Sequence, residues 1–295
     1  WTKVVQGGFG SDQAHRNNVA VMCAKVFKGK LYIGTMNWQT GCEVYRSKVS
    51  NPSSNSDWGR VVNKGFKDFE AGTYYYKNRY AWSMEVFNGS DNIERLYVGT
   101  FNPKTGFHVY RTSNGTSWSY VTKNGFGYSL DWGARTMKEF KGKLYVGTAR
   151  NFISGANAGC TIWRSSTGNP GSFSKVATNG FGNKYNRYAW SMEEYDAPNG
   201  QKQLWVGTAN VRLTYSNPRS EGCEVWFSDD GTNWHLSVDG GFGNKYNEGA
   251  RTLKSYDPPG SHPNGLYMGT YHLRLIGYTN GGCEVWRRET AGSSS

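Results

Sequence analysis

Short apolar runs with alternating polar positions recur along the chain, and two strings mark their period. The string LYIGT and its relatives end at Thr35, Thr100, Thr148, Thr208 and Thr270, so the copies are 48 to 65 residues apart. The hexapeptide GCEVYR and its relatives begin at Gly41, Gly106, Gly159, Gly222 and Gly282. Recurrence of this kind predicts a repeat architecture.

Each repeat predicts four short antiparallel strands. In the fourth repeat we expect them at residues 189–195, 203–209, 223–228 and 234–238. The pair Asp230-Gly231 supplies a hairpin turn between the third and fourth strands. Four such strands in every repeat are typical of a β-propeller blade.

Five repeats therefore predict an all-β, five-bladed propeller of four-stranded antiparallel blades. We expect one domain over residues 1–290 and a flexible tail at residues 291–295. The fifth repeat has only three strand-like runs, and residues 1–10 (WTKVVQGGFG) match residues 234–243 (WHLSVDGGFG), which hold the fourth strand of the preceding repeat. The N-terminal strand is thus expected to close the C-terminal blade, which would remove the exposed sheet edges.

The third strand of each blade is expected to be buried on both sides, because it faces two neighbouring blades. Four cysteines occupy equivalent places there, namely Cys42, Cys160, Cys223 and Cys283. Packed sheets lie about 10 Å apart and a disulfide needs Cα atoms within about 7 Å, so we expect these four to be buried apolar residues. We expect Cys23 to be a free thiol, and a pair with Cys42 of the same blade is the alternative. No metal or other cofactor is expected, because no ligands converge at short spacing.

Charge and composition indicate which kind of partner the chain could bind. The net charge is +12 and aromatic residues make up 16% of the chain, which suits an anionic partner, although a basic protein can simply be soluble. No apolar run approaches the roughly 18 residues of a membrane helix, so no membrane insertion is expected. The chain begins with Trp1 and not with Met, which fits a removed signal peptide. We expect an extracellular monomer.

The hairpin SDDGTNW at residues 228–234, with its relative TSNGTSW at 112–118, resembles the Asp-box of sialidase-type propellers but lacks one residue between Asp and Gly. In those families the box is a structural turn, so the resemblance implies a secreted propeller and no particular activity. The GCEVWR and LYVGT strings also resemble repeat propellers of microbial surface proteins. Five-bladed propellers include lectins and glycoside hydrolases, and the fold does not choose between them.

The loops before the first strands and those between the second and third strands share one face of a propeller, and here they vary most in length. The second-to-third loop is short at residues 36–41 and long at residues 209–222. Because the strands are kept while these loops vary, we expect this face to be the functional one. Neutral drift of loops is the competing interpretation.

One equivalent position near the start of the first strands reads Met22, Trp82, Arg135, Trp190 and Arg251. We predict a mouth of arginine and aromatic side chains whose substrate-binding residues are Arg79, Tyr80, Trp82, Arg135, Arg187, Tyr188, Trp190, Arg212, Arg251, His272 and Arg274. Guanidinium groups bind carboxylate, sulfate or phosphate through paired hydrogen bonds. Alternatively, these residues lock blades together, with the arginines paired to Glu43, Glu224 or Glu284.

The resulting hypothesis is a lectin-like propeller that binds a glycan or another polyanion. The alternative is a glycan-cleaving enzyme at the same face. A hydrolase needs two carboxylates about 5 Å or about 6.5–9.5 Å apart, and the acids in the loops are Glu70, Asp131 and Glu248. A lyase could use Tyr188, His272 and Arg251 instead.

Two other functions fit the composition less well. Basic charge with aromatic residues is compatible with nucleic-acid binding, but the absence of Lys/Arg clusters counts against it. A structural role, in which the propeller is a rigid spacer on a surface, also fits the sequence. Asn88 and Asn114 begin glycosylation sequons, and His108, in a third strand, is expected to be a core residue.

Overall fold

The computed structural model describes residues 1–67, 77–151, 158–211, 221–257, 265–272 and 282–288. Antiparallel strands dominate these residues, and the only α-helices among them are the four-residue α1 (Gln13–Arg16) and α2 (Lys64–Lys67). The prediction of an all-β, antiparallel chain is therefore confirmed. No helix within these ranges has the length and apolar character needed to cross a membrane.

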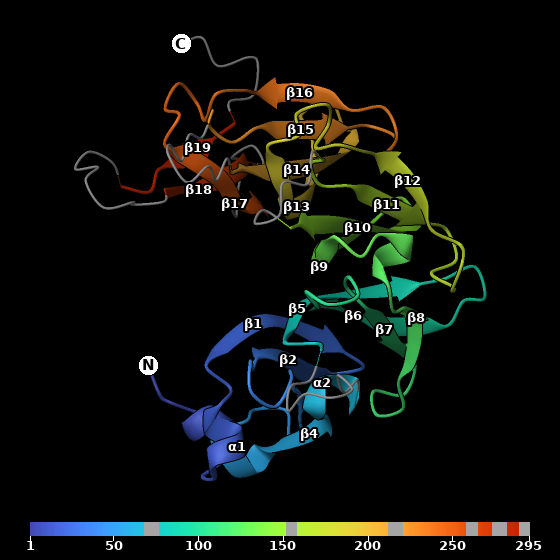
Figure 1. Ribbon diagram of the computed structural model, residues 1–295, viewed down its shortest axis with the longest axis vertical. Coiled ribbons are helices and arrows are strands. Elements are labelled where there is room, and N and C mark those ends of the chain that lie inside the picture. The colour runs from blue at the N-terminus through green and yellow to red at the C-terminus, as the bar shows by residue number, and fades with distance from the viewer. Residues whose placement is uncertain (68–76, 152–157, 212–220, 258–264, 273–281, 289–295) are drawn as a thin grey trace. The chain divides into compact units, whose positions relative to one another are not determined.

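The strands follow one another in groups that we call blades, numbered in chain order (Figure 1). Blade 1 contains β1 (Ala20–Phe27), β2 (Lys30–Met36), β3 (Val44–Ser47) and β4 (Trp58–Val62). Blade 2 contains β5 (Tyr80–Asn88), β6 (Glu94–Phe101), β7 (Val109–Thr112) and β8 (Ser119–Thr122). Blade 3 contains β9 (Asp131–Phe140), β10 (Lys143–Arg150), β11 (Ile162–Ser165) and β12 (Ser174–Ala177).

Blade 4 contains β13 (Asn186–Asp196), β14 (Lys202–Asn210), β15 (Val225–Ser228) and β16 (His235–Val238). Blade 5 has three described strands, β17 (Asn247–Tyr256), β18 (Gly265–His272) and β19 (Val285–Arg287). Consecutive strands pair in antiparallel register, for example Trp205 with Phe227 in blade 4 and Tyr97 with Arg111 in blade 2. Within the described ranges, three short 3₁₀ turns, η1 (Gly7–Phe9), η2 (Asn55–Asp57) and η3 (Gly125–Gly127), lie in the connections.

The chain divides into two compact units. Unit 1 comprises residues 1–144 and 165–173, and unit 2 comprises residues 145–164 and 174–295. Each unit has its own core, with Val44, Leu96 and Val98 buried in unit 1 and Trp205, Val225 and Ala250 buried in unit 2. A single domain over residues 1–290 stays a prediction, and the tail at residues 291–295 lies outside the described residues.

Packing between strands explains why the glycine of the LYVGT string is repeated. A Cβ added to Gly207 would lie 2.6 Å from the Cβ of Ala250 and 2.7 Å from the Oγ of Ser191. Gly99 makes the same approach to Ala134 and Ser83 in unit 1. Glycine is therefore required where the second strand of one blade touches the first strand of the next, since any side chain would force the two strands apart.

We expect Gly207→Ala to destabilise the protein by about 1–3 kcal/mol, because the added methyl group overpacks the contact with Ala250. The measurement is the urea midpoint followed by circular dichroism. Gly59→Ala is the matched control, since a Cβ there meets its nearest atom, the flexible Lys48 side chain, at 3.5 Å. Equal midpoints for the two variants would contradict the packing argument.

Closure of the ring by an N-terminal strand stays a prediction. Residues 1–5 lie outside any strand in the structure, and Trp1 is fully exposed. Strand β19 pairs with β18, and Val285 is 76% exposed while the equivalent Val44 is fully buried. A lone segment gains no ladder hydrogen bonds until it meets a sheet edge, so ring closure is not confirmed.

The cysteine prediction holds at three of its four positions. All five cysteines are free thiols; Cys42, Cys160 and Cys223 are buried, but Cys283 is exposed. The reason is that Cys283 precedes β19, whose residues are exposed within unit 2. Burial of Cys42 and Cys223 also raises the pKa of their thiols, which keeps them protonated. His108 is buried as predicted.

Candidate ligand-binding site

The predicted site position coincides with an irregularity in the first strand of the blades. The ladder register shifts between Ala81 and Ser83, and between Ala189 and Ser191, so Trp82 and Trp190 stand outside the regular pairing. The same shift in β17 singles out Arg251. A β-bulge of this kind re-aims a side chain and is common beside functional sites.

In unit 1 the structure brings together four of the predicted residues in an arginine–aromatic cluster. We define the unit 1 cluster as Trp38, Arg79, Tyr80, Trp82, Phe101, Trp132 and Arg135. The guanidinium carbon of Arg135 lies 4.9 Å from the ring centroid of Trp82, and that of Arg79 lies 4.6 Å from Trp38. Both arginines thus stack on indole faces.

Aromatic rings contact one another within the unit 1 cluster. The Tyr80 and Phe101 rings stack with centroids 4.6 Å apart, and Trp82 meets Phe101 edge-on at 5.2 Å. Trp82 and Phe101 are buried, whereas Trp38 is exposed. The cluster therefore combines buried aromatic rings with an exposed indole and two half-buried arginines.

Sequence reasoning missed Trp38, Phe101 and Trp132. A usable signal existed for Phe101, because the residue directly after the LYxGT string is aromatic only at Phe101 and Tyr271. These are the rings that contact the bulge residues Trp82 and Arg251.

Unit 2 contains a second arrangement of the same kind, the unit 2 cluster, made of Tyr188, Trp190, Arg251 and Tyr271. The Arg251 guanidinium lies 5.9 Å from the ring centroids of both Trp190 and Tyr271, which are themselves 5.0 Å apart. Tyr188 meets Trp190 edge-on at 5.9 Å. In both clusters an arginine of one blade therefore stacks on the tryptophan of the blade before it.

The remaining predicted residues have varied surroundings. Arg187 is buried and donates a hydrogen bond from Nη1 to the carbonyl of Ala158 at 2.9 Å. Burial, helped by the nearby Arg150, lowers the pKa of Arg187. The His272 ring lies 5.7 Å from that of Tyr246. Arg212 and Arg274 lie outside the described residues.

The glutamates proposed as alternative partners of the site arginines are held by other groups. Glu43 pairs with Arg60 at 2.8 Å and accepts hydrogen bonds from Asn18 and Tyr45. Glu224 accepts hydrogen bonds from Asn183, Asn186 and Trp226.

Glu284 repeats the arrangement with Asn244, Asn247 and Trp286, and the Asn247 hydrogen bond is the largest cause of its lowered pKa. Each of these glutamates therefore connects the third strand of a blade to the segment that enters the same blade, and its partners are asparagine, tyrosine and tryptophan side chains or Arg60.

Of the candidate catalytic acids, the structure describes Asp131 and Glu248, which belong to different units. Asp131, in unit 1, is buried and occupies the position of the structural Asn78, Asn186 and Asn247. Glu248, in unit 2, is also buried. Glu70 lies outside the described residues. Among the residues that the structure describes, no three His, Cys, Asp or Glu side chains gather to hold a metal ion.

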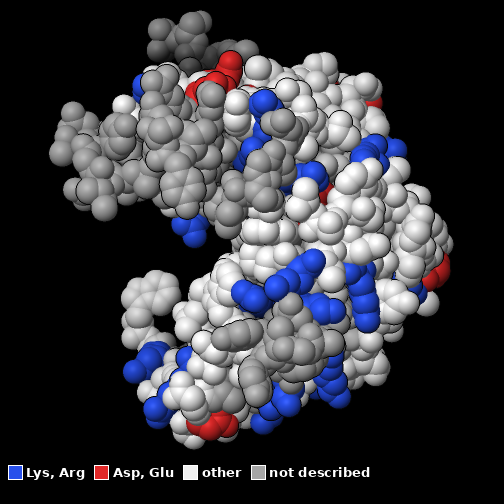
Figure 2. All heavy atoms as spheres, in the orientation of Figure 1, with Lys and Arg blue, Asp and Glu red and all other residues white. Residues whose placement is uncertain are grey.

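The surface charge matches the composition. Lys and Arg clearly outnumber Asp and Glu on the face seen in Figure 2, as expected for a chain with a net charge of +12. An excess of positive charge raises the local concentration of anions and speeds their association.

No protein-family model matches this chain, and no curated protein does. Solved structures similar to it include an alpha-L-arabinofuranosidase from Podospora anserina in complex with cellotriose, with 10% identity, 95% of this chain and 94% of that chain covered, and a TM-score of 0.46. A putative exo-beta-1,3-galactanase from Bifidobacterium bifidum has 13% identity over 84% and 80% of the chains, with a TM-score of 0.43. Trypanosoma rangeli sialidase has 14% identity over 85% and 42%, with a TM-score of 0.45. Likeness at this level carries no argument about function.

Proposed function

We propose that this chain is an extracellular, lectin-like protein whose arginine–aromatic clusters bind an acidic glycan or a comparable polyanion. The observation that carries the proposal is the repeated pair, Arg135 on Trp82 and Arg251 on Trp190. The pair occurs twice, and Trp82, Trp190 and Arg251 are bulge residues, whose side chains regular strand pairing does not dictate.

The chemistry of the pair suits an anionic sugar. Stacking uses the flat face of a guanidinium group, so its N–H edge keeps the geometry that matches a carboxylate or a sulfate. An indole face beside it offers a flat apolar surface for the ring of a sugar. Arg251 is exposed, which gives solutes access to it.

We expect Arg135→Ala and Arg251→Ala each to weaken binding of an acidic oligosaccharide about tenfold to a hundredfold. Each variant loses charge-assisted hydrogen bonds worth about 1.5–3 kcal/mol. Titration calorimetry with heparin fragments and a neutral oligosaccharide, at low and high salt, measures the effect. Single-stranded DNA serves as a parallel polyanion, and binding should weaken as salt rises.

Lys202→Ala is the charge-matched control, since this exposed lysine pairs with Glu194 and belongs to neither cluster. It should leave affinity nearly unchanged. If Arg135→Ala and Arg251→Ala instead keep full affinity and only lower the urea midpoint, the arginines serve packing and the binding proposal fails.

A glycan-cleaving enzyme at the same face is the second candidate. The similar structures are those of enzymes that act on carbohydrates, but a similarity this weak does not extend their activity to this chain. Asp131 occupies the position at which other repeats have a buried structural asparagine. This position favours a structural role for Asp131 over a catalytic one, and therefore binding over hydrolysis. The titrations should therefore be followed by chromatography of the glycan, and released fragments would establish the enzyme instead.

The architecture that we propose for this function is a closed, monomeric, five-bladed propeller whose N-terminal strand completes blade 5. Five repeats support the blade count. The exposed β19 supports closure, because its equivalents in the other blades are buried.

Closure can be tested through Cys283. In a closed ring this thiol should be buried like the equivalent Cys42, so we expect it to react with Ellman's reagent only when the protein unfolds. A Cys283→Ala variant should then show the same reaction time course as the wild type. A fast-reacting thiol that disappears in Cys283→Ala would show that the ring stays open.

A further inference from the structure

A pocket of about 290 Å³ opens in unit 1 where blade 1 meets blade 2. It lies between β4, the Gly-Phe turn that follows β4, and the hairpin that joins β7 to β8. Its apolar walls are formed by Val61, Val62, Phe66, Tyr110 and Trp118. Its polar lining residues are Asn63, Lys67 and Thr116. None of these residues belongs to the unit 1 cluster, so the pocket is a separate place at which a ligand can bind.

Aromatic rings give this pocket a fixed wall. Phe66 stacks on Tyr110 with ring centroids 3.8 Å apart, and the Trp118 ring meets Phe66 edge-on at 5.6 Å. Tyr110 is buried, whereas Phe66 and Trp118 are half-buried, so part of their ring surface is accessible. An accessible aromatic surface suits the apolar face of a sugar ring.

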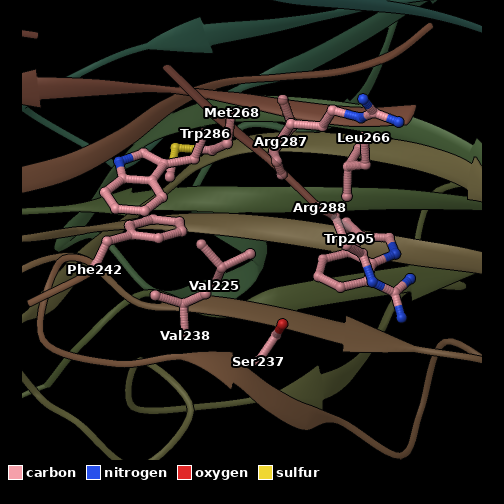
Figure 3. A pocket seen from close by; sticks show the side chains of 11 residues that line it. Trp205, Val225, Ser237, Val238, Phe242, Leu266, Met268, Trp286, Arg287 and Arg288 are labelled. Carbon is pink, nitrogen blue, oxygen red and sulfur yellow. The ribbon is translucent and has the colours of Figure 1, made fainter. Parts of the chain in front are cut away.

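Unit 2 has a pocket at the corresponding place, beside the stacked rings of Phe242 and Trp286 (Figure 3). These two residues are equivalent to Phe66 and Tyr110. The polar lining residues of the unit 2 pocket are Ser237, Arg287 and Arg288. Among the described residues, none directly after Phe242 lines this pocket, whereas Lys67 follows Phe66 in unit 1. The comparison therefore singles out Lys67 as a feature of the unit 1 pocket.

Lys67 also departs from the pattern of the repeat. It stands where the other repeats have Gly10, Gly127, Gly182 and Gly243. Its backbone is left-handed, with φ = 59°, as it is at the last three of these glycines, where φ is 81–98°. The Cβ of a lysine disfavours this conformation, and glycine has no such atom. Residues that break a local rule in this way are expected mainly at functional sites.

The polar residues of the pocket suit the substituents of a sugar. The backbone N–H of Lys67 donates to the carbonyl of Asn63 at 3.4 Å, so one turn carries both side chains. Asn63 is half-buried and Lys67 is exposed. The Thr116 hydroxyl donates to Oδ1 of Asn114 at 3.3 Å, and its oxygen can still accept a hydrogen bond. An ammonium group, an amide and a hydroxyl therefore line a pocket whose walls are aromatic.

We propose that the unit 1 pocket binds a single sugar ring that carries a carboxylate, such as a hexuronate. The ring lies against Trp118 and Phe66, the carboxylate pairs with the ammonium of Lys67, and Asn63 and Thr116 bind the hydroxyl groups. Small-molecule pockets begin at about 300 Å³, so the volume fits one ring. This inference goes beyond the proposed function, because it adds a site that uses neither arginine–aromatic cluster.

An NMR titration of the indole N–H signals with glucuronate tests the site. The Trp118 signal, identified as the one absent in Trp118→Phe, should shift saturably. Lys67→Gly should weaken this titration about tenfold, because the carboxylate loses a charge-assisted partner. The urea midpoint of Lys67→Gly should equal or exceed that of the wild type, since glycine adopts the left-handed backbone without a steric cost. Lys67→Arg keeps the charge and should bind more tightly than Lys67→Gly.

Lys64→Gly is the matched control for charge and backbone. Lys64 is another exposed, left-handed lysine of the same turn, with φ = 51°, but it does not line the pocket. Its replacement should leave the Trp118 titration unchanged. An equal loss of affinity in Lys64→Gly and Lys67→Gly would show that only the general positive charge matters, and it would overturn the proposal.

Two other sugars or acids define the ligand class. Glucose has a similar ring without the carboxylate, and benzoate has a carboxylate on a ring without hydroxyl groups. Each should bind at least about tenfold more weakly than glucuronate, because each lacks one set of hydrogen-bond partners. A Trp118 signal that does not move with glucuronate, or that titrates equally well with benzoate, would overturn the assignment.

Arg135→Ala separates this site from the proposed function. It should weaken heparin binding and leave the Trp118 titration with glucuronate unchanged. Loss of the Trp118 titration in Arg135→Ala would show that glucuronate acts through the unit 1 cluster, and it would overturn the separate site. A normal heparin response together with an unmoved Trp118 signal would overturn this inference alone.

Discussion

Acidification from pH 6.5 to pH 3 is expected to remove on the order of 4–5 kcal/mol of stability through one residue, His108. Burial is the main cause that lowers the pKa of His108 to about 3, against about 6.5 in an unfolded chain. Between these values the unfolded state binds more protons than the folded state, so the free energy of unfolding falls as the pH falls. The contribution is complete above pH 6.5 and lost below pH 3.

The surroundings of His108 explain why protonation is costly. Its Nδ1 and Nε2 atoms lie 3.1 and 3.0 Å from the amide nitrogens of Asn78 and Asn102, which are hydrogen-bond donors. A neutral imidazole keeps one nitrogen as an acceptor for these amides, whereas a charged imidazole donates from both nitrogens and loses that acceptor. Nearby lysines, Lys123 and Lys77, add to the repulsion.

The test compares urea denaturation of the wild type and His108→Gln at pH values from 7 to 3.5. Because other carboxyl groups also titrate there, the informative quantity is the difference between the two profiles. The wild type should lose stability more steeply than the variant between pH 6.5 and pH 4. Parallel profiles would contradict a buried neutral histidine.

The second large effect is expected at Glu224, where Glu224→Ala should cost about 3 kcal/mol or more. Glu224 is buried and accepts hydrogen bonds of 2.6 Å from Asn183 and Asn186 and of 2.8 Å from Trp226. Truncation leaves these donors without their acceptor, and each buried unsatisfied group costs about 1–3 kcal/mol. Urea denaturation at pH 7 provides the measurement.

Two variants make the Glu224 result specific. Glu224→Gln keeps one acceptor oxygen and should fall between the wild type and Glu224→Ala. Glu94→Ala removes an exposed glutamate and should stay within about 0.5 kcal/mol of the wild type. A loss for Glu224→Ala no larger than that for Glu94→Ala would exclude a structural role for the network.

The strands of this chain were predictable because the repeat shows the same local pattern five times. In blade 4 the second strand was expected at residues 203–209, and β14 spans Lys202–Asn210. The third strand was expected to begin at Cys223, but β15 begins at Val225. The difference arises because the Cys223 N–H donates to the carbonyl of Asn247, outside the ladder with β14.

The site was predictable only in part, since a position in a repeat does not fix what a side chain touches. The Trp–Arg alternation indicated the bulge residues, and the stacking of Arg135 on Trp82 explains that alternation. Arg79 and Arg187 are equivalent in sequence, yet Arg79 stacks on Trp38 while Arg187 is buried against Ala158. Their partners lie in loops whose sequences differ between blades, so the repeat pattern does not predict these contacts.

The bulge in the first strands has a consequence for how this protein can diversify. A residue outside the regular pairing can change identity without shifting the register of its neighbours, and the chain already holds methionine, tryptophan and arginine at this one position. Under the proposed function, the residues that recognise the ligand are therefore different from those that build each blade. Single substitutions at the bulge position could then change ligand preference, while the glycines, asparagines and glutamates that build the blades stay the same.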